Sequence, residues 1–256
     1  MKLENVKRIG VLGAGVMGGG IAQSIILAGL PVIVRDLNDE ICKKSRDTII
    51  GGRFGIKGGV ERGKTTQAEM DAALARLAYT TKVEDLKDCD LVIEAIGGGD
   101  TGRLEDKPLK LRIFTELDKV VKPAAVFASN TSMFTIADLA AVTSRKPRFV
   151  GMHLFSPANI MKLVEVTYTA DTAEETIKLI EDLARKIDKT PVRVKDVPGD
   201  TGFIANRVYG AAAREAMKIV QEGIATAEDV NTAMTLGFRW PIGPLAMGAG
   251  ARSGWK

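Results

Sequence analysis

Residues 8–23 read RIGVLGAGVMGGGIAQ, a GxGxxG pattern between an apolar run and a helix-like segment. The first glycine of such a pattern permits a tight turn, the second lets the backbone approach a pyrophosphate, and the third lets helix pack on strand. The amino end of the helix adds amide protons and a positive dipole. The next apolar run ends at Asp36, eighteen residues after Gly18, where a carboxylate accepts hydrogen bonds from ribose hydroxyls. The expected dinucleotide-binding residues are Gly13, Gly15, Val16, Met17, Gly18 and Asp36.

The acid at the end of the second run predicts which dinucleotide binds. A carboxylate at Asp36 repels a 2′-phosphate, which favours NAD over NADP, although the neighbouring Arg35 offsets part of that charge. The alternative is a glycine-rich turn that binds nothing. The arrangement of strand, helix and acid in register favours dinucleotide binding over this alternative.

Short β-branched runs alternate with helical patterns as far as residue 196. This alternation predicts an α/β fold of the Rossmann type, a doubly wound and mostly parallel sheet with helices on both faces. Residues 172–188 show the helical period best. The runs expected as strands are 8–12, 31–35, 91–96, 125–129, 149–154, 162–168 and 191–195.

Beyond Asp196 the pattern becomes helical only. We therefore expect an NAD-binding domain at 1–197 and a smaller all-helical domain at 198–256. The segment 198–256 is too short to form a stable hydrophobic core of its own. We therefore expect it to pack on the first domain or on a second chain, as in a homodimer.

Charge and cysteine content exclude several classes of protein. The net charge of +4 is mild and interspersed, so no nucleic-acid partner is expected. Residues 9–34 carry no charge, but glycines and Pro31 divide them into strand, turn and helix, so we expect neither a membrane span nor a signal peptide. Cys42 and Cys89 form no metal-binding pattern, so we expect no metal, and cytoplasm is the default location.

The single histidine, His153, follows an apolar run, and a second run shortly after it carries Glu165. Neighbouring strands can bring the two together, and a carboxylate on one ring nitrogen fixes the tautomer of a catalytic base. Ser132 follows another strand, at the edge where ligands bind in open α/β sheets. Asn206 begins the helical segment as an amide donor. The alternatives are a structural histidine, a helix cap at Ser132 for residues 134–142, and a solvated helix position at Asn206.

With these residues in view, the chain resembles the 3-hydroxyacyl-CoA dehydrogenase family. The matching stretches are GVLGAGVMGGGIAQ, LVIEAI, FASNTS, GMHLFSPANIMKLVEV, VPG, GFIANRV and WPIGPL. The resemblance implies NAD-dependent oxidation of a (S)-3-hydroxyacyl-CoA to the 3-ketoacyl-CoA, or the reverse, a reaction of fatty-acid β-oxidation. It implies His153 as the base, Glu165 as its partner, and Ser132 and Asn206 as groups that orient the substrate. The further cofactor positions that it implies are Glu105, Lys110 and Ser156.

The resemblance also implies a coenzyme A contact in the basic stretch 43–64, which holds seven cations against two anions. Lys57 and Lys64 are the expected contacts, and a solvated face is the alternative. By its glycine content, 52–64 is expected to be a loop. Glycine-rich insertions at 97–104 and 199–201 depart from the family pattern. Relatives continue further beyond the Gly-Pro at 243–244, so the resemblance implies a shortened helical domain.

Two other functions remain open on the sequence. One is a dehydrogenase of another 3-hydroxy acid, although the nearby β-hydroxyacid dehydrogenases use a lysine instead of a His and Glu pair. The other is an NAD-binding protein without catalysis, like the lens crystallin that resembles this family.

Overall fold

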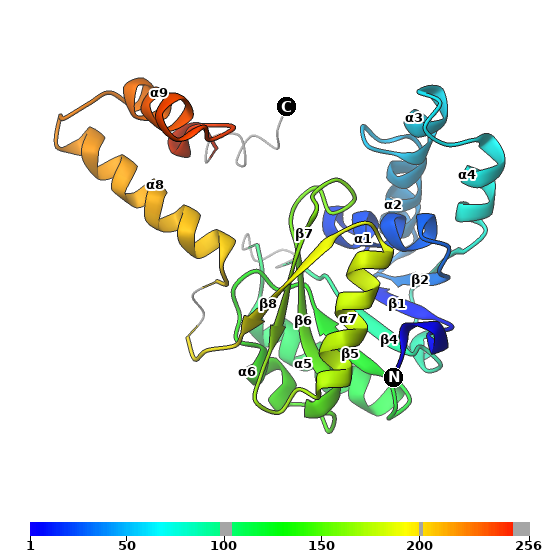
Figure 1. The fold of residues 1–256 in the computed structure, drawn as a ribbon. Helices are drawn as coiled ribbons and strands as arrows, with labels where there is room; N and C mark the ends of the chain where they lie inside the picture. The colour runs from blue at the N-terminus through cyan, green and yellow to red at the C-terminus, as the bar shows by residue number, and fades with distance from the viewer. Residues whose placement is uncertain (98–103, 200–201, 248–256) are drawn as a thin grey trace. The chain divides into compact units, whose positions relative to one another are not determined.

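The protein is described by a computed structural model that covers residues 1–97, 104–199 and 202–247 (Figure 1). The described residues form one eight-stranded sheet in the order β3-β2-β1-β4-β5-β6-β7-β8. The strands are β1 Ile9–Leu12, β2 Val32–Arg35, β3 Leu77–Thr80, β4 Leu91–Glu94, β5 Val126–Ser129, β6 Phe149–Leu154, β7 Leu163–Tyr168 and β8 Thr190–Lys195. All seven predicted strands are confirmed, and β3 is an additional edge strand that the sequence did not predict.

The order of the strands reverses at β1, which lies between β2 and β4. All neighbouring strands run parallel except β6 and β7, which are antiparallel. In a doubly wound sheet the carboxyl edge at such a reversal is where ligands bind. The predicted α/β class is therefore confirmed, and the place to look for a site is the edge beyond β1 and β4.

The helices of the described chain connect these strands and then continue alone. They are α1 Val16–Leu27, α2 Asp39–Gly51, α3 Ile56–Glu61, α4 Gln67–Leu74, α5 Lys107–Val120, α6 Ile136–Ala141, α7 Glu174–Lys186, α8 Ala205–Gln221 and α9 Ala227–Phe238, with short 3-10 turns η1 Leu3–Asn5, η2 Val83–Leu86 and η4 Lys146–Arg148. The helix predicted at 172–188 is confirmed by α7. The expectation of a loop over 52–64 is wrong, because Ile56–Glu61 forms α3 and buries Ile56. Of the two glycine-rich insertions, 98–103 and 200–201 lie outside the described residues.

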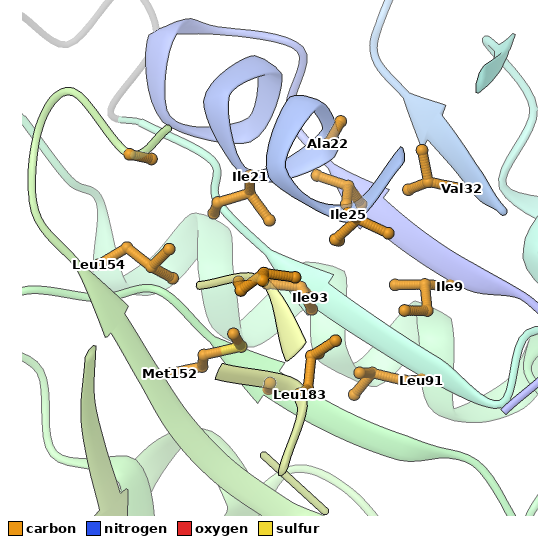
Figure 2. Close-up of a cluster of buried hydrophobic side chains, with 14 of the residues drawn as sticks. Ile9, Ile21, Ala22, Ile25, Val32, Leu91, Ile93, Met152, Leu154 and Leu183 are labelled. Carbon is orange, nitrogen blue, oxygen red and sulfur yellow. The ribbon is translucent and has the colours of Figure 1, made fainter. Parts of the chain in front are cut away.

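Both faces of the sheet are covered by apolar side chains. On one face Ile21 and Ile25 of α1 pack over Ile9 and Ile93, with Met152 beside them (Figure 2). On the other face three phenylalanine rings pack together with ring centroids 4.7 to 6.4 Å apart, and the ring of Phe149 meets the other two edge to face; the three are Phe114 of α5, Phe127 of β5 and Phe149 of β6. Each buried ring or aliphatic side chain stabilises the fold by about 1.5–3 kcal/mol. The sheet is thus a rigid support for groups at its edge.

The chain divides into two compact units, Met1–Asp200 and Thr201–Lys256. The first unit holds the whole sheet and α1 to α7, and the described part of the second holds α8 and α9. Among the described residues, no helix is both long enough and apolar enough to cross a membrane.

Candidate active site

The glycines of the GxGxxG pattern each have a structural reason. Gly13 has a φ of +94°, and a Cβ there would lie 2.7 Å from the carbonyl oxygen of Ala95. A Cβ on Gly18 would lie 1.7 Å from the carbonyl oxygen of Gly13. Gly15, by contrast, precedes α1 with no side-chain cap, and a Cβ there would meet no described atom within 4 Å. The space over Gly15 and the uncapped amides of α1 fit a bound pyrophosphate.

Asp36 lies where the sequence expects a ribose-binding acid. Its two carboxylate oxygens accept hydrogen bonds from the backbone amides of Ala14, at 2.5 Å, and Leu37, at 2.7 Å. The acid therefore touches the glycine turn directly. Val16 lies 77% exposed at the start of α1. The residues predicted to bind the dinucleotide are thus adjacent in space, and they fit the group.

His153 and Glu165 are direct register partners on the antiparallel strands β6 and β7. The Nδ1 atom of His153 lies 2.7 Å from Oε2 of Glu165, and both side chains are buried. A carboxylate has no proton to donate, so Nδ1 carries the hydrogen and the lone pair of a neutral ring lies on Nε2. The predicted proximity of the two residues is confirmed. The aromatic ring of Phe155, with its centroid 4.4 Å from that of His153, packs against the imidazole.

Ser132 does not cap a helix. Both its backbone amide and its hydroxyl donate to Oε1 of Glu105, at 2.7 and 2.5 Å, while α6 begins four residues later. The capping alternative for Ser132 is therefore wrong, and the serine is bound to an acid. Burial raises the pKa of Glu105, but the ammonium of Lys110 and the hydrogen bonds from Ser132 lower it by more, so this pKa lies below its ordinary value. A carboxylate that is ionised at neutral pH thus fixes Ser132.

Behind Glu105 lies a buried cluster of charges. The ammonium of Lys110 donates to Oε1 of Glu94 at 2.5 Å and to the carbonyl of Ile96 at 3.0 Å, and lies 3.3 Å from Oε2 of Glu105. The hydroxyl of Ser129 donates to Oε2 of Glu94 at 2.6 Å. The side chains of Glu94 and Lys110 are 0% and 2% exposed. Sequence reasoning missed Glu94 and Ser129; the available signal was a charge inside the apolar run LVIEAI.

Strand register places the charged cluster and the histidine on one face of the sheet. Glu94 is aligned with Ser129, and Ser129 with Gly151. His153 is two residues further along β6 than Gly151, so its side chain points to the same face. A Cβ on Gly151 would lie 3.0 Å from Ile136, so α6 covers this face. The carboxyl edges of β4, β5 and β6 thus present acid, hydroxyl and imidazole together.

Four other predicted residues are exposed. Ser156 is exposed in the loop after β6, and Lys57 and Lys64 are exposed on and after α3, in the arm of helices α2 to α4 (Figure 1). Asn206 is exposed in the first turn of α8, in the second unit of the chain. The roles of these four residues remain predictions.

Two family models match the chain. The model described as the NAD binding domain of 3-hydroxyacyl-CoA dehydrogenase matches residues 8–197, and the model described as its C-terminal domain matches residues 202–251.

Individual relatives cover most of the chain. A probable 3-hydroxybutyryl-CoA dehydrogenase of Deinococcus radiodurans is 38% identical over 94% of this chain and 81% of its own length. The mitochondrial hydroxyacyl-coenzyme A dehydrogenase of Homo sapiens is 36% identical over 94% of this chain and 75% of its own length. The crystal structure of a (S)-3-hydroxybutyryl-CoA dehydrogenase from Ralstonia eutropha superposes with a TM-score of 0.88 at 37% identity, covering 95% of this chain and 81% of that one.

Proposed function

Because the chain belongs to the 3-hydroxyacyl-CoA dehydrogenase family, we propose that His153 and Glu165 carry out its proton transfer and that the edge of the sheet around them is the active site. The reaction is NAD-dependent oxidation of a (S)-3-hydroxyacyl-CoA to the 3-ketoacyl-CoA, or the reverse. The observation that carries the proposed role is the buried contact of 2.7 Å between the imidazole and the carboxylate.

Glu165 prepares His153 to act as a base. By accepting the hydrogen of Nδ1, the carboxylate leaves the Nε2 lone pair available to take the proton of the C3 hydroxyl. When Nε2 takes that proton the ring becomes positive, and the buried carboxylate stabilises it as a charge-assisted pair. In the reverse direction the same Nε2 returns the proton to the oxygen.

The glycine turn and the acids around it provide the cofactor site. The amides at the start of α1 would hold the pyrophosphate, and Asp36 would bind the adenine ribose. The nicotinamide end of the dinucleotide would lie near Glu105, Lys110, Ser132 and Ser156. When bound, NAD supplies the hydride acceptor that the protein lacks.

Substrate binding divides between two regions. Ser132, fixed by Glu105, and Asn206 orient the oxygens of the acyl group. Lys57 and Lys64 attract the phosphates of coenzyme A, because both are exposed cations on an arm with a surplus of positive charge. The division of the chain at 197 and 198 into an NAD-binding and a helical domain remains part of this proposal.

The experiment is direct. Purified protein is mixed with NADH and acetoacetyl-CoA, and the absorbance band of NADH is followed. We expect it to decay with wild-type protein and, for His153→Gln, to decay about 10² to 10⁴ times more slowly, with unchanged NADH affinity. Near-normal turnover in this variant would remove His153 from the mechanism, and no decay with wild-type protein would favour a non-catalytic NAD-binding role.

We further propose a homodimer in the cytoplasm. In the second unit the helices α8 and α9 expose large apolar side chains, which include Val208 at 63%, Leu236 at 79% and Phe238 at 75%. Apolar side chains of this size favour burial against a second surface. Light scattering at micromolar concentration tests the dimer, and a monomeric mass contradicts it.

A further inference from the structure

The buried cluster behind Ser132 carries a surplus of negative charge. Its charged members are two carboxylates, Glu94 and Glu105, and one ammonium, Lys110. Glu94 receives hydrogen bonds from the Ile96 amide, the Ser129 hydroxyl and Lys110, all donors, as suits an ionised carboxylate. One lysine therefore forms ion pairs with two carboxylates, and the cluster has a net charge of −1.

This charge lies directly beneath the dinucleotide turn. The amide of Ile96 donates to Oε1 of Glu94, and the carbonyl of the same residue accepts from Lys110. The preceding carbonyl, of Ala95, is the group that a Cβ on Gly13 would strike at 2.7 Å. The segment Ala95–Ile96, which contacts the first glycine of the GxGxxG turn, is thus hydrogen-bonded to the charged cluster through both the amide and the carbonyl of Ile96.

The same charge faces the site of hydride transfer. Glu94 on β4 and His153 on β6 share a face of the sheet and are two strand spacings and two residues apart, which is roughly 12 Å. The nicotinamide ring must approach a substrate held by His153, so it comes within a similar distance of Glu94. The side chains of Glu94 and Lys110 are at most 2% exposed, so water screens their charges little.

We propose that Glu94 raises the affinity of the enzyme for oxidised relative to reduced coenzyme, by giving the cluster a negative charge that stabilises the positive nicotinamide ring of NAD⁺. The neutral ring of NADH gains nothing from this charge. Glu94 touches neither substrate nor coenzyme in this account and acts through the field of the cluster. The inference rests on the proposed function of the edge as the nicotinamide site.

The test is the ratio of two dissociation constants, for NAD⁺ by calorimetry and for NADH by fluorescence. Glu94→Gln keeps the shape of the side chain and brings the cluster to zero charge. A unit charge at roughly 12 Å, with an effective dielectric constant of about 20, changes such a ratio roughly tenfold. We expect NAD⁺ binding to weaken relative to NADH binding by that factor. In Glu94→Gln/Lys110→Gln the cluster returns to −1, and the ratio returns to near the wild-type value.

If Glu94 has only a structural role, the pattern differs. Glu94→Gln then weakens the binding of NAD⁺ and of NADH equally, and the double variant binds both more weakly than the single variant does. If Glu94→Gln does not fold, Lys110→Gln alone, which brings the cluster to −2, carries the test, and the ratio then shifts toward NAD⁺. Asp90→Asn is the matched control, an acid with a lysine partner directly before the start of the strand that Glu94 ends, and it leaves the ratio unchanged.

The two proposals fail in different ways. Wild-type protein that binds neither coenzyme contradicts the proposed function. Wild-type protein that binds both, together with an unchanged ratio in the folded Glu94→Gln variant, overturns the inference and leaves the proposed function intact.

Discussion

Replacing Glu165 with Gln tests the proposed proton transfer most sharply. The amide keeps the size of the side chain, and its oxygen still accepts the hydrogen of Nδ1, so the tautomer of His153 is preserved. Only the negative charge is lost. The two groups are 2.7 Å apart and at most 5% exposed. With charge centres about 4 Å apart and an effective dielectric constant of about 20, that charge stabilises the imidazolium by at most about 4 kcal/mol. We expect kcat to fall about 10² to 10³-fold.

The assay is steady-state reduction of acetoacetyl-CoA with NADH, with the dissociation constant of NADH measured separately. We expect that constant to stay within about twofold of wild type, since Glu165 lies on β7, away from the glycine turn. His153→Gln/Glu165→Gln should be no slower than His153→Gln alone, because the carboxylate acts through the ring. Glu181→Gln is the control, a glutamate of α7 paired with Arg193 outside the site. A Glu165→Gln variant within fivefold of wild-type kcat would show that the charge of Glu165 does not stabilise the imidazolium.

Four other changes have defined outcomes. Asp36→Ser removes the charge that repels a 2′-phosphate, so the ratio of NADPH to NADH turnover should rise about tenfold or more; an unchanged ratio would show that another group selects the coenzyme. Lys57→Ala/Lys64→Ala should raise the KM for acetoacetyl-CoA about fivefold with kcat unchanged, whereas an unchanged KM indicates a solvated face. Arg145→Met removes a buried guanidinium that binds Asp118 and four backbone carbonyls, so unfolding free energy should fall by about 3 kcal/mol and the Tm by roughly 10 °C in calorimetry; a shift under 2 °C would contradict this. Because the folded pKa of Glu105 is lowered, its contribution to stability is complete above its ordinary pKa of 4.5 and is lost as pH falls through the folded value, so Glu105→Gln should flatten the decline of the urea midpoint on the acid side; equal slopes in both proteins would count against the ion pair.

Those parts of the fold that depend on short-range order can be predicted from the residue pattern alone. The strand, turn and helix of residues 8–23 follow from glycines whose spacing matches the needs of one turn, and the structure shows the close contacts that require them. The pairing of His153 with Glu165 followed from two apolar runs joined by a short connection, which must lie side by side in a sheet. Gly18 and Gly13 are five residues apart and His153 and Glu165 twelve, so local geometry limits where they can lie, whereas the contact of Gly13 with Ala95 depends on the pairing of β1 with β4.

Other features depend on contacts between distant parts of the chain. The edge strand β3 is four residues long and only Leu77 in it is buried, so it has no alternating or continuous apolar pattern, and its pairing with β2 defines it. The helix α3 forms in a glycine-rich stretch because burial of Ile56 outweighs poor helix propensity.

The charged cluster shows the same limit within the site. Glu94, Ser129 and Lys110 come from two strands and a helix up to 35 residues apart. Their contacts depend on the register of β4 with β5 and on the rotation of α5 about its axis. A charge inside an apolar run is unfavourable unless a partner is present, but the run does not specify that partner. The identity of the partner is set by the packing of helix on sheet, which no local pattern encodes.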